Sequence, residues 1–232
     1  MCGIAGIIGT NTEERTRAML RSIEHRGRDD EGVWTSRQLE DGRHACLGHR
    51  RLAIIDTSSA GHQPMLSPDG RFALTFNGEI YNYRELKSQL AARGHSFQTD
   101  TDTEVLLAAF AEWGEGCLPR LNGMFAFAIW DAEERQLTLA RDRMGIKPLY
   151  YAAVKGEQGA AFIFASEVKA ILTTGLAERA LNNEGLNQFL TFLWTPDPQT
   201  LFRGIRKLPP AHVLVWRDCA ARVREWWDVS FD

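Results

Sequence analysis

Apolar residues recur along this chain with two spacings, one typical of strands and one typical of helices. Short apolar runs bounded by glycine, proline or polar turn residues predict strands. The helical spacing is clearest where Val105, Leu106, Ala109 and Phe110 fall on one face. We expect strands at residues 2–8, 32–35, 45–55, 72–77, 123–131, 136–142, 149–154, 161–165, 211–216 and 222–229. We expect helices at residues 12–24, 84–92, 103–113, 167–172 and 183–192.

The order of these predicted elements points to a fold class. Strands and helices come in blocks instead of alternating regularly, which favours an α+β fold with antiparallel sheets over a doubly wound parallel sheet. Polar segments at 25–32 and 195–198 are typical of loops, and no long linker divides the chain. We therefore expect residues 1–232 to form one domain, of a length that can bury a sizeable core.

Composition narrows the function classes that this fold can serve. Hydrophobic residues make up 44% of the 232 positions and charged residues 25%, values typical of a globular domain. The 30 acidic and 27 basic side chains give a net charge of −3, which argues against a nucleic-acid binder. No apolar run approaches the roughly 20 residues of a membrane span, and the first residues lack the basic segment of a signal peptide. We therefore expect a cytoplasmic protein with neither nucleic acid nor membrane as partner.

One cysteine occupies an unusual position, directly behind the initiator methionine. A thiol in an apolar strand usually only packs, and that interpretation of Cys2 stays open. Methionine removal is efficient when the second residue is small, and loss of Met1 leaves Cys2 with a free α-amine. Such an amine titrates near about 7.7–8.0 and can act as general base for its own side chain, as in N-terminal threonine hydrolases. The position therefore predicts a nucleophile that needs no separate histidine.

The other three cysteines lack this context. Cys46 lies in an apolar segment, Cys117 near a helix end and Cys219 after a turn, and we interpret each as a packing or incidental residue. No CxxC pair and no cysteine–histidine cluster has the spacing of a zinc site. We therefore expect no metal site and four reduced thiols, as is typical of the cytosol.

Several motifs occur in one order along the chain: MCGIAGI, HRGRDDEG, LGHRRLAIID, FNGEIYNYREL, TDTEVLL, LNGMFAFAIWD and LARDRMGIKPLYY. Together they resemble the glutaminase domain of glutamine-hydrolysing asparagine synthetases, from Cys2 to about Trp227. That family belongs to the class II glutamine amidotransferases, within the N-terminal-nucleophile hydrolases. The resemblance implies a four-layer αββα sandwich, in which two antiparallel sheets lie between helices. It also implies that the chain hydrolyses glutamine to glutamate and ammonia.

The resemblance assigns a nucleophile and an oxyanion hole. Family members attack the side-chain amide of glutamine with a cysteine thiolate, here that of Cys2, and water hydrolyses the resulting glutamyl thioester. The oxyanion needs donors fixed in advance, and the family's donors map to the Asn77 side chain and the Gly78 backbone. Glycine permits close approach of a backbone N–H, and asparagine carries an amide donor. Without the surrounding motif, the same AsnGly pair predicts an ordinary hairpin turn.

Glutamine also presents a carboxylate and an ammonium, which the resemblance matches with Arg51 and Asp102. A guanidinium forks onto two carboxylate oxygens, which suits Arg51. The adjacent Arg50, on the opposite face of the predicted strand, is the alternative. Asp102 has a second interpretation, as the N-cap of the helix at 103–113 with Glu104 in its first turn, and the two roles are compatible.

Four further positions match the family's glutamine pocket. Glu79 matches a glutamine-binding residue, and the backbone at Leu52, Ile54 and Ile55 matches a stretch that lines the pocket. Without the resemblance, the pattern of these three apolar side chains predicts the buried core of a strand.

The segment at 25–29 departs from the family pattern, in which HRG is followed by ProAsp. Arg28 stands in place of the proline, so this loop loses a residue with a fixed φ. We interpret Arg26 and Asp29 as a pair that closes the loop, rather than as substrate ligands.

The resemblance also implies a second domain that these residues do not contain. Asparagine synthetases carry a C-terminal domain that binds ATP through a Ser-Gly-Gly-x-Asp-Ser loop and adenylates aspartate, and no such loop occurs here. We expect glutaminase chemistry without a cofactor, with ATP and Mg needed only by the absent synthetase domain. The expected partners are L-glutamine and that domain, from the same gene or a separate chain, and a homodimer stays open.

Two alternative functions remain. The same glutaminase can serve another acceptor, in synthetase-like proteins of secondary pathways, in glucosamine-6-phosphate synthases or in phosphoribosylpyrophosphate amidotransferases. An inactive homologue can act as a scaffold. The presence of Cys2, Arg51, Asn77, Gly78 and Asp102 disfavours the scaffold.

Overall fold

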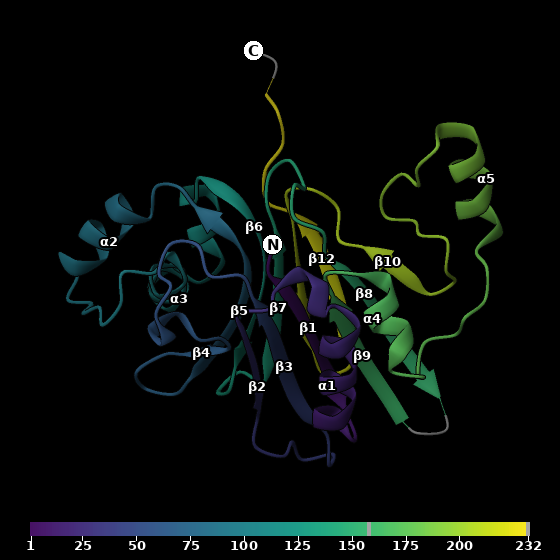
Figure 1. The fold of residues 1–232 in the computed structure, drawn as a ribbon, viewed down its shortest axis with the longest axis horizontal. Coiled ribbons are helices and arrows are strands. Elements are labelled where there is room, and N and C mark those ends of the chain that lie inside the picture. Colours follow the sequence, from purple (N-terminus) through teal and green to yellow (C-terminus); the bar gives the residue numbers. More distant parts are fainter. Residues whose placement is uncertain (157–158, 231–232) are drawn as a thin grey trace.

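In the computed structural model, which describes residues 1–156 and 159–230, the strands form two antiparallel sheets (Figure 1). Sheet A has the spatial order β10 (Ile205–Lys207), β8 (Tyr150–Gly156), β9 (Gly159–Ala165), β1 (Gly3–Gly9), β3 (His44–Arg51) and β2 (Asp30–Thr35). Sheet B has the order β12 (Ala220–Glu225), β11 (His212–Arg217), β7 (Gln136–Arg141), β6 (Gly123–Asp131), β5 (Phe72–Ile80) and β4 (Met65–Leu66). The prediction of an α+β fold with antiparallel sheets is confirmed.

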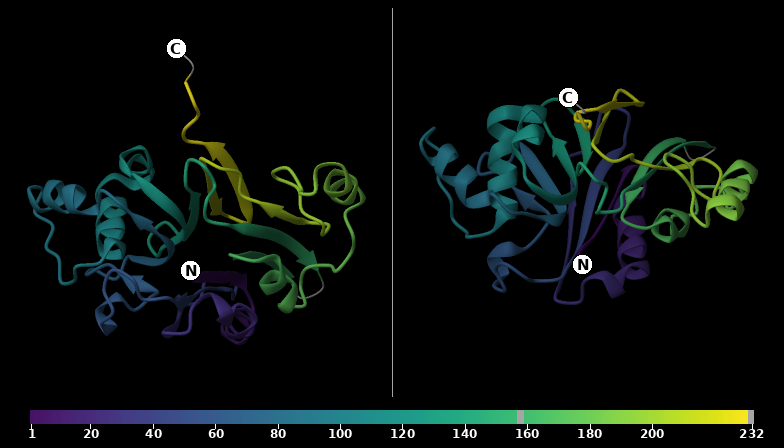
Figure 2. Two further views of the ribbon diagram at one scale, coloured as in Figure 1. Left: turned by 45° about the horizontal axis from the view of Figure 1, so that its top comes forward. Right: turned by 90° about the horizontal axis from the view of Figure 1, so that it is seen from above.

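Helices cover the outer face of each sheet, which gives four layers (Figure 2). Sheet A carries α1 (Thr12–Ser22) and α4 (Val168–Thr173), and sheet B carries α2 (Tyr83–Ala91) and α3 (Asp102–Trp113). Helix α5 (Asn183–Phe192) projects to one side, and the described residues also include the 3₁₀ turns η1 (Glu24–Arg26), η2 (Ser59–Gly61) and η3 (Gly114–Arg120). The αββα sandwich is confirmed. Among the described residues, no helix combines the length and the apolar character that crossing a membrane requires.

Strand periodicity decides which side chains enter which layer of the core. In β1, Ile4 and Ile8 pack between the sheets, whereas Ile7 packs beneath the helices of sheet A. Trp130 of β6 and Phe162 of β9 meet the same inter-sheet cluster from opposite sheets. Because β1 is central and buried on both faces, its first residues are held rigidly at one end of the inter-sheet core.

The predicted strand at 45–55 is wrong in its second half, because β3 ends at Arg51. Arg51 pairs with Asp30 at the start of β2, and no strand pair extends past this position. The next residues therefore leave the sheet. The predicted core positions Leu52, Ile54 and Ile55 are instead 38%, 68% and 38% exposed.

Other boundaries differ where the hydrophobic signal is weak. The final predicted strand at 222–229 is β12 (Ala220–Glu225), whose residues are all exposed and so show no alternation. The predicted loop at 25–32 contains η1 and the first residues of β2, and the helix expected at 12–24 ends at Ser22. Strands β4 and β10 were not predicted, since two or three residues are too short to show a period.

Candidate active site

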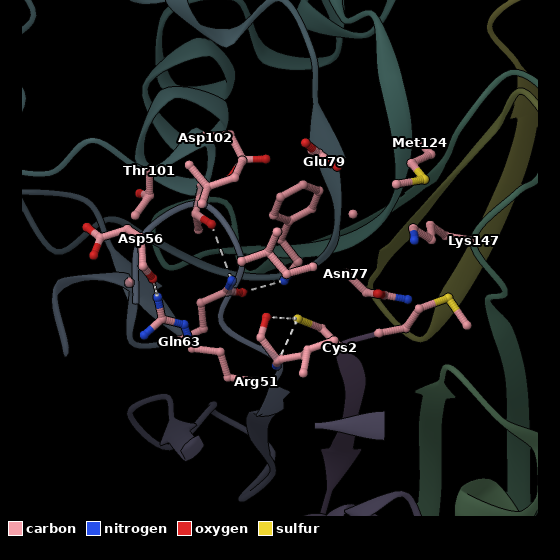
Figure 3. A pocket seen from close by; sticks show the side chains of 18 residues that line it. Cys2, Arg51, Asp56, Gln63, Asn77, Glu79, Thr101, Asp102, Met124 and Lys147 are labelled. Atoms are coloured by element: carbon pink, nitrogen blue, oxygen red, sulfur yellow. Dashed lines mark hydrogen bonds between the residues drawn. The ribbon is translucent and has the colours of Figure 1, made fainter. Parts of the chain in front are cut away.

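A pocket of about 180 Å³ lies where the start of β1 meets the inner face of sheet B (Figure 3). Its walls come from the N-terminus, the loop after β3, the second half of β5, the start of α3 and the loop after β7. All nine residues predicted for the site line this one pocket: Cys2, Arg51, Leu52, Ile54, Ile55, Asn77, Gly78, Glu79 and Asp102. Their chemical roles stay predictions, and the contacts of each are described below.

The Cys2 thiol faces the chain where it leaves β3. The Leu52 N–H donates to the Cys2 Sγ at 3.4 Å, and the thiol lies 3.6 Å from the Leu52 carbonyl oxygen. The main chain of the same residue is also held, because Arg26 Nε donates to the Cys2 carbonyl at 2.9 Å. Arg26 is itself fixed by an ion pair with Glu167 at 3.0 Å. The nucleophile is therefore anchored through both its side chain and its backbone.

Burial raises the pKa of the Cys2 thiol. The Leu52 N–H opposes this effect, as do the charges of the N-terminus, Arg51 and Lys147, in that order. Met1 also lines the pocket, and while it is attached the nitrogen of Cys2 is an amide. The thiol therefore needs a nearby base and nearby cations before it can act as a thiolate.

The Asn77 side chain comes from the inner face of sheet B. Asn77 is 1% exposed, and its Nδ2 is buried without a hydrogen-bond acceptor in the part of the chain that the structure describes. A buried amide donor without a partner is uncommon in native structures and calls for an explanation. Such a donor, lining the same pocket as Cys2, is ready for an acceptor that arrives with a ligand.

The edge of β5 that faces away from β6 carries a row of backbone groups bound by side chains. The Phe76 N–H donates to Gln63 Oε1 at 2.7 Å, and the Ile80 N–H donates to Asp102 Oδ2 at 2.9 Å. Backbone groups two residues apart on a strand point to the same edge. The N–H of Gly78, midway between these two, therefore points to this edge as well, at the pocket wall.

The interpretation of AsnGly as a hairpin turn is wrong, because both residues lie inside β5. Gly78 pairs with Phe125 of β6, and a Cβ at Gly78 would lie 2.3 Å from the Met124 carbonyl oxygen. Glycine at this position is thus required by strand pairing, independently of any ligand.

Two carboxylates form the acidic end of the pocket, one from α3 and one from β5. Asp102 is 6% exposed, and burial raises its pKa to about 6 against the opposing effect of the Ile80 N–H, with a further rise from nearby Glu79. The N-cap interpretation of Asp102 is wrong, because Thr101 caps α3 by accepting from the Glu104 N–H at 3.2 Å. The Asp102 carboxylate is therefore not the helix cap, and it lines the pocket.

The two neighbouring arginines of β3 are separated by the strand's alternation. Arg51 lines the pocket, where its guanidinium donates to the backbone carbonyls of Ser58, at 2.6 Å, and Asp56. Arg50 points to the other face and forms an ion pair with Glu31 at 2.6 Å. Arg50 does not line the pocket, so of these two arginines the structure favours Arg51 as the ligand of the carboxylate.

Four buried polar residues that line the pocket were not predicted from the sequence: Gln63, Thr101, Thr103 and Lys147. Gln63 is 4% exposed and joins β5 to α3, because its Nε2 donates to Thr103 Oγ1 at 3.3 Å. Lys147 is 6% exposed and follows β7. Lys147 lies in the LARDRMGIKPLYY motif, and its place in that motif is the one signal that could have found it. Gln63 lies in a loop without periodicity and left no signal.

The predicted pairing of Arg26 with Asp29 is wrong. Arg26 pairs with Glu167, and the Asp29 carboxylate instead accepts from the Ala53 N–H at 2.8 Å. Asp29 thereby holds the loop after β3, while Arg26 holds Cys2. The segment at 25–29 supports the pocket from behind.

The remaining cysteines are free thiols. Cys46 and Cys117 pack in the hydrophobic core, as predicted, and burial raises the pKa of Cys117 to about 12. Cys219 is exposed. Within residues 1–156 and 159–230, no group of three or more His, Cys, Asp or Glu side chains is arranged to hold a metal ion.

A family model described as a glutamine amidotransferase domain matches residues 1–227. The chain belongs to this family. Curated relatives agree: asparagine synthetase [glutamine-hydrolyzing] 3 of Bacillus subtilis is 36% identical over 99% of this chain and 37% of its own length. Asparagine synthetase [glutamine-hydrolyzing] 1 of the same organism is 38% identical over 90% of this chain and 32% of its own length. The chain thus spans about a third of the length of these relatives.

Solved structures share the fold of this glutamine amidotransferase domain. Glutamine phosphoribosylpyrophosphate amidotransferase from B. subtilis, complexed with ADP and GMP, superposes with a TM-score of 0.71 at 23% identity. The superposition covers 97% of this chain and 49% of that one. The predicted resemblance to the glutaminase domain of asparagine synthetases is confirmed by the family match and by the identities of these relatives.

Proposed function

We propose that this domain hydrolyses glutamine through Cys2 and that the ammonia feeds an ATP-dependent synthetase part, which amidates aspartate to asparagine. The observation that carries the glutaminase step is the buried Asn77 Nδ2, which has no acceptor within the described residues. It lines the same pocket as the Cys2 thiol and as Gly78, whose N–H reaches the open edge of β5. A nucleophile with two fixed donors nearby is the arrangement that stabilises a tetrahedral oxyanion.

The two ends of the pocket suit the two charged ends of glutamine. Arg51 is the cation for the α-carboxylate, while Asp102 and Glu79 take the α-ammonium. The backbone at Leu52, Ile54 and Ile55 closes one side of the pocket. With its ends bound in this way, the side-chain amide extends toward the thiol.

The reaction needs the α-amine of Cys2, so Met1 must be removed first. The amine takes the thiol proton, and the thiolate attacks the amide carbon to give an oxyanion bound by Asn77 Nδ2 and the Gly78 N–H. Collapse returns the proton to the leaving ammonia and leaves a glutamyl thioester, which water hydrolyses to glutamate. These steps need no metal or nucleotide. A thiol nucleophile is preserved in a reducing compartment, which supports a cytoplasmic location.

The acceptor is proposed from the relatives, which are named for asparagine synthesis and continue well beyond the matched region. ATP and Mg belong to that synthetase part, which would receive the ammonia either on the same polypeptide or as a separate chain. The greater identity to these relatives than to the phosphoribosylpyrophosphate enzyme supports aspartate over a phosphorylated sugar as the final acceptor.

The test is glutamate release by purified protein without metal or nucleotide. The intact mass should begin at Cys2, and Cys2→Ala should abolish hydrolysis but keep glutamine binding, because attack follows binding. Asn77→Ala should lower kcat by roughly 10²–10³, since one oxyanion donor is lost. Asn187→Ala, at an exposed position on α5, is the matched control and should leave kcat unchanged. Full activity in Asn77→Ala contradicts the oxyanion role, and full activity with Met1 retained contradicts the amine as base.

A further inference from the structure

Lys147 is a lysine of the pocket to which the proposed reaction gives no role. It lines the pocket and is 6% exposed, with its amino group turned toward the interior of the pocket (Figure 3). Its Nζ forms no hydrogen bond or ion pair with any residue that the structure describes. The Nζ is accessible from the open pocket, so this ammonium can act on any group that lies there.

The position of Lys147 is fixed by its backbone and not by its side chain. The Lys147 N–H donates to Asp142 Oδ2 at 3.0 Å, and Arg141 Nε donates to the Lys147 carbonyl at 2.8 Å. Asp142 also accepts from the N–H groups of Phe125 and Ile146. This network holds the loop after β7, so the ammonium can be removed by substitution without loss of the loop.

The charged groups near Cys2 fall into two sets. The pocket itself contains the cations of Arg51 and Lys147 and the carboxylates of Asp56, Glu79 and Asp102. Behind Cys2, Arg26 contacts its carbonyl and is neutralised by its ion pair with Glu167. Figure 3 shows Lys147 on the side of Cys2 away from Arg51 and Asp102.

Resting on the function proposed above, the glutamine carboxylate pairs with Arg51 and its ammonium lies at the acidic end formed by Asp102 and Glu79. Lys147 is the pocket cation to which that arrangement assigns no ligand group. We propose that Lys147 holds Cys2 in its reactive state by favouring the thiolate and the unprotonated α-amine.

The charge acts on two proton equilibria of the same residue. A positive charge in the same pocket stabilises the thiolate and destabilises the ammonium form of the Cys2 amine. The thiol proton passes to that amine, the sulfur electron pair forms the S–C bond, and the same proton leaves with ammonia. Lys147 transfers no proton and forms no bond. It is a positioning residue, because its charge acts only on the protonation of Cys2.

The experiment measures the thiol directly, in processed protein without glutamine. The rate of Cys2 alkylation by iodoacetamide is followed from pH 6 to 10 by mass spectrometry of the N-terminal peptide, which separates it from the exposed Cys219. Lys147→Met should raise the midpoint by at least about 0.5 pH unit. Lys147→Arg should keep the wild-type midpoint because it keeps the charge. Lys155→Met, at an exposed position on β8, is the matched control and should change nothing.

The kcat profile for glutamate release supplies the second readout, because it reports the ionisations of the glutamine complex. Its acidic limb should move upward in Lys147→Met and stay in place in Lys147→Arg. An unchanged alkylation midpoint in Lys147→Met overturns the proposal, as does an equal shift in Lys147→Arg. The alkylation result stands even for a chain that hydrolyses no glutamine, so a failure of the glutaminase function is recognised separately by the absence of glutamate.

Discussion

At the scale of single residues, Asp102 couples the pocket to pH. Burial raises the pKa of its carboxyl to about 6, so the group is ionised at neutral pH and becomes protonated in mild acid. Only the carboxylate can pair with an ammonium. We therefore expect the affinity of Cys2→Ala protein for glutamine, measured by calorimetric titration, to fall about tenfold per pH unit below pH 6.

The matched control places Asp102→Asn in the same Cys2→Ala background. The asparagine oxygen can still accept from the Ile80 N–H, so the fold is retained while the charge is lost. This variant should bind glutamine weakly, with an affinity that does not change between pH 5 and 7. Equal affinity of the Cys2→Ala protein at pH 5 and pH 7 would show that Asp102 does not bind the ammonium.

At the scale of elements, the short turn η2 holds Arg51 in place. A Cβ at Gly61 would lie 2.0 Å from Arg51 Nη2, so the guanidinium can occupy its position only against a glycine. Gly61→Ala should displace this flexible end and raise KM for glutamine about tenfold, equivalent to about 1.4 kcal/mol, with little change in kcat. Gly116→Ala is the control, because the nearest atom to its Cβ would be 4.0 Å away. A wild-type KM in Gly61→Ala argues against Arg51 as the carboxylate ligand.

Elements were predictable from the sequence where local pattern determines them. The positions of β1, β5 and α3 follow from their own apolar spacing, and Cys2, Asn77 and Asp102, which the motifs singled out, line one pocket. The end of β3 was not predictable, because the apolar run continues while the neighbouring strands stop. Beyond Arg51, the Leu52 N–H turns to the Cys2 thiol instead of to a strand.

Contacts across the fold account for the rest of the site. Gln63 reaches β5, and Lys147 reaches the pocket, through long-range packing that leaves no period in the sequence. The partner of Arg26 is Glu167, which lies far along the chain, and not the nearby Asp29 that the local sequence indicates. Local spacing can predict the element and the face on which a polar residue lies, but it cannot predict which distant residue that side chain contacts.

At the scale of the whole molecule, polar bridges join the two sheets near the pocket. His49 of β3 is fully buried, and its Nε2 donates to the Phe76 carbonyl of β5 at 3.0 Å. Thr75 of β5 donates through Oγ1 to the Gly48 carbonyl of β3 at 3.1 Å. These two bonds link the sheets within the inter-sheet layer and fix the spacing on which the pocket depends.

The buried histidine makes the fold sensitive to acid. Burial lowers the pKa of His49 to about 4, whereas an unfolded histidine titrates near 6.5. The unfolded chain therefore binds the proton first, and stability present above pH 6.5 is lost as pH falls toward 4, by about 3 kcal/mol. Asp102 acts in the opposite direction over much of this range, because its folded pKa is raised. Urea unfolding from pH 7 to 4 should show a smaller loss in His49→Gln than in wild type.

Comparison of variants isolates the histidine from Asp102, since both proteins retain that carboxylate. His212→Gln, which removes a half-buried histidine of β11, is the control and should follow wild type. A His49→Gln protein that loses as much free energy of unfolding as wild type between pH 6.5 and 4 would show that His49 takes up its proton while still folded.

Cys2 is held by Arg26 at its carbonyl and by Leu52 at its sulfur, whereas Met1 is 58% exposed. Cutting the bond between residues 1 and 2 therefore leaves every one of these restraints in place. The processed and unprocessed chains should share one shape and differ only in chemistry. Under the proposed mechanism, an unprocessed molecule holds glutamine without consuming it. The specific activity of a preparation is then proportional to the fraction of its chains that have lost Met1. Incomplete cleavage lowers apparent kcat while leaving KM unchanged.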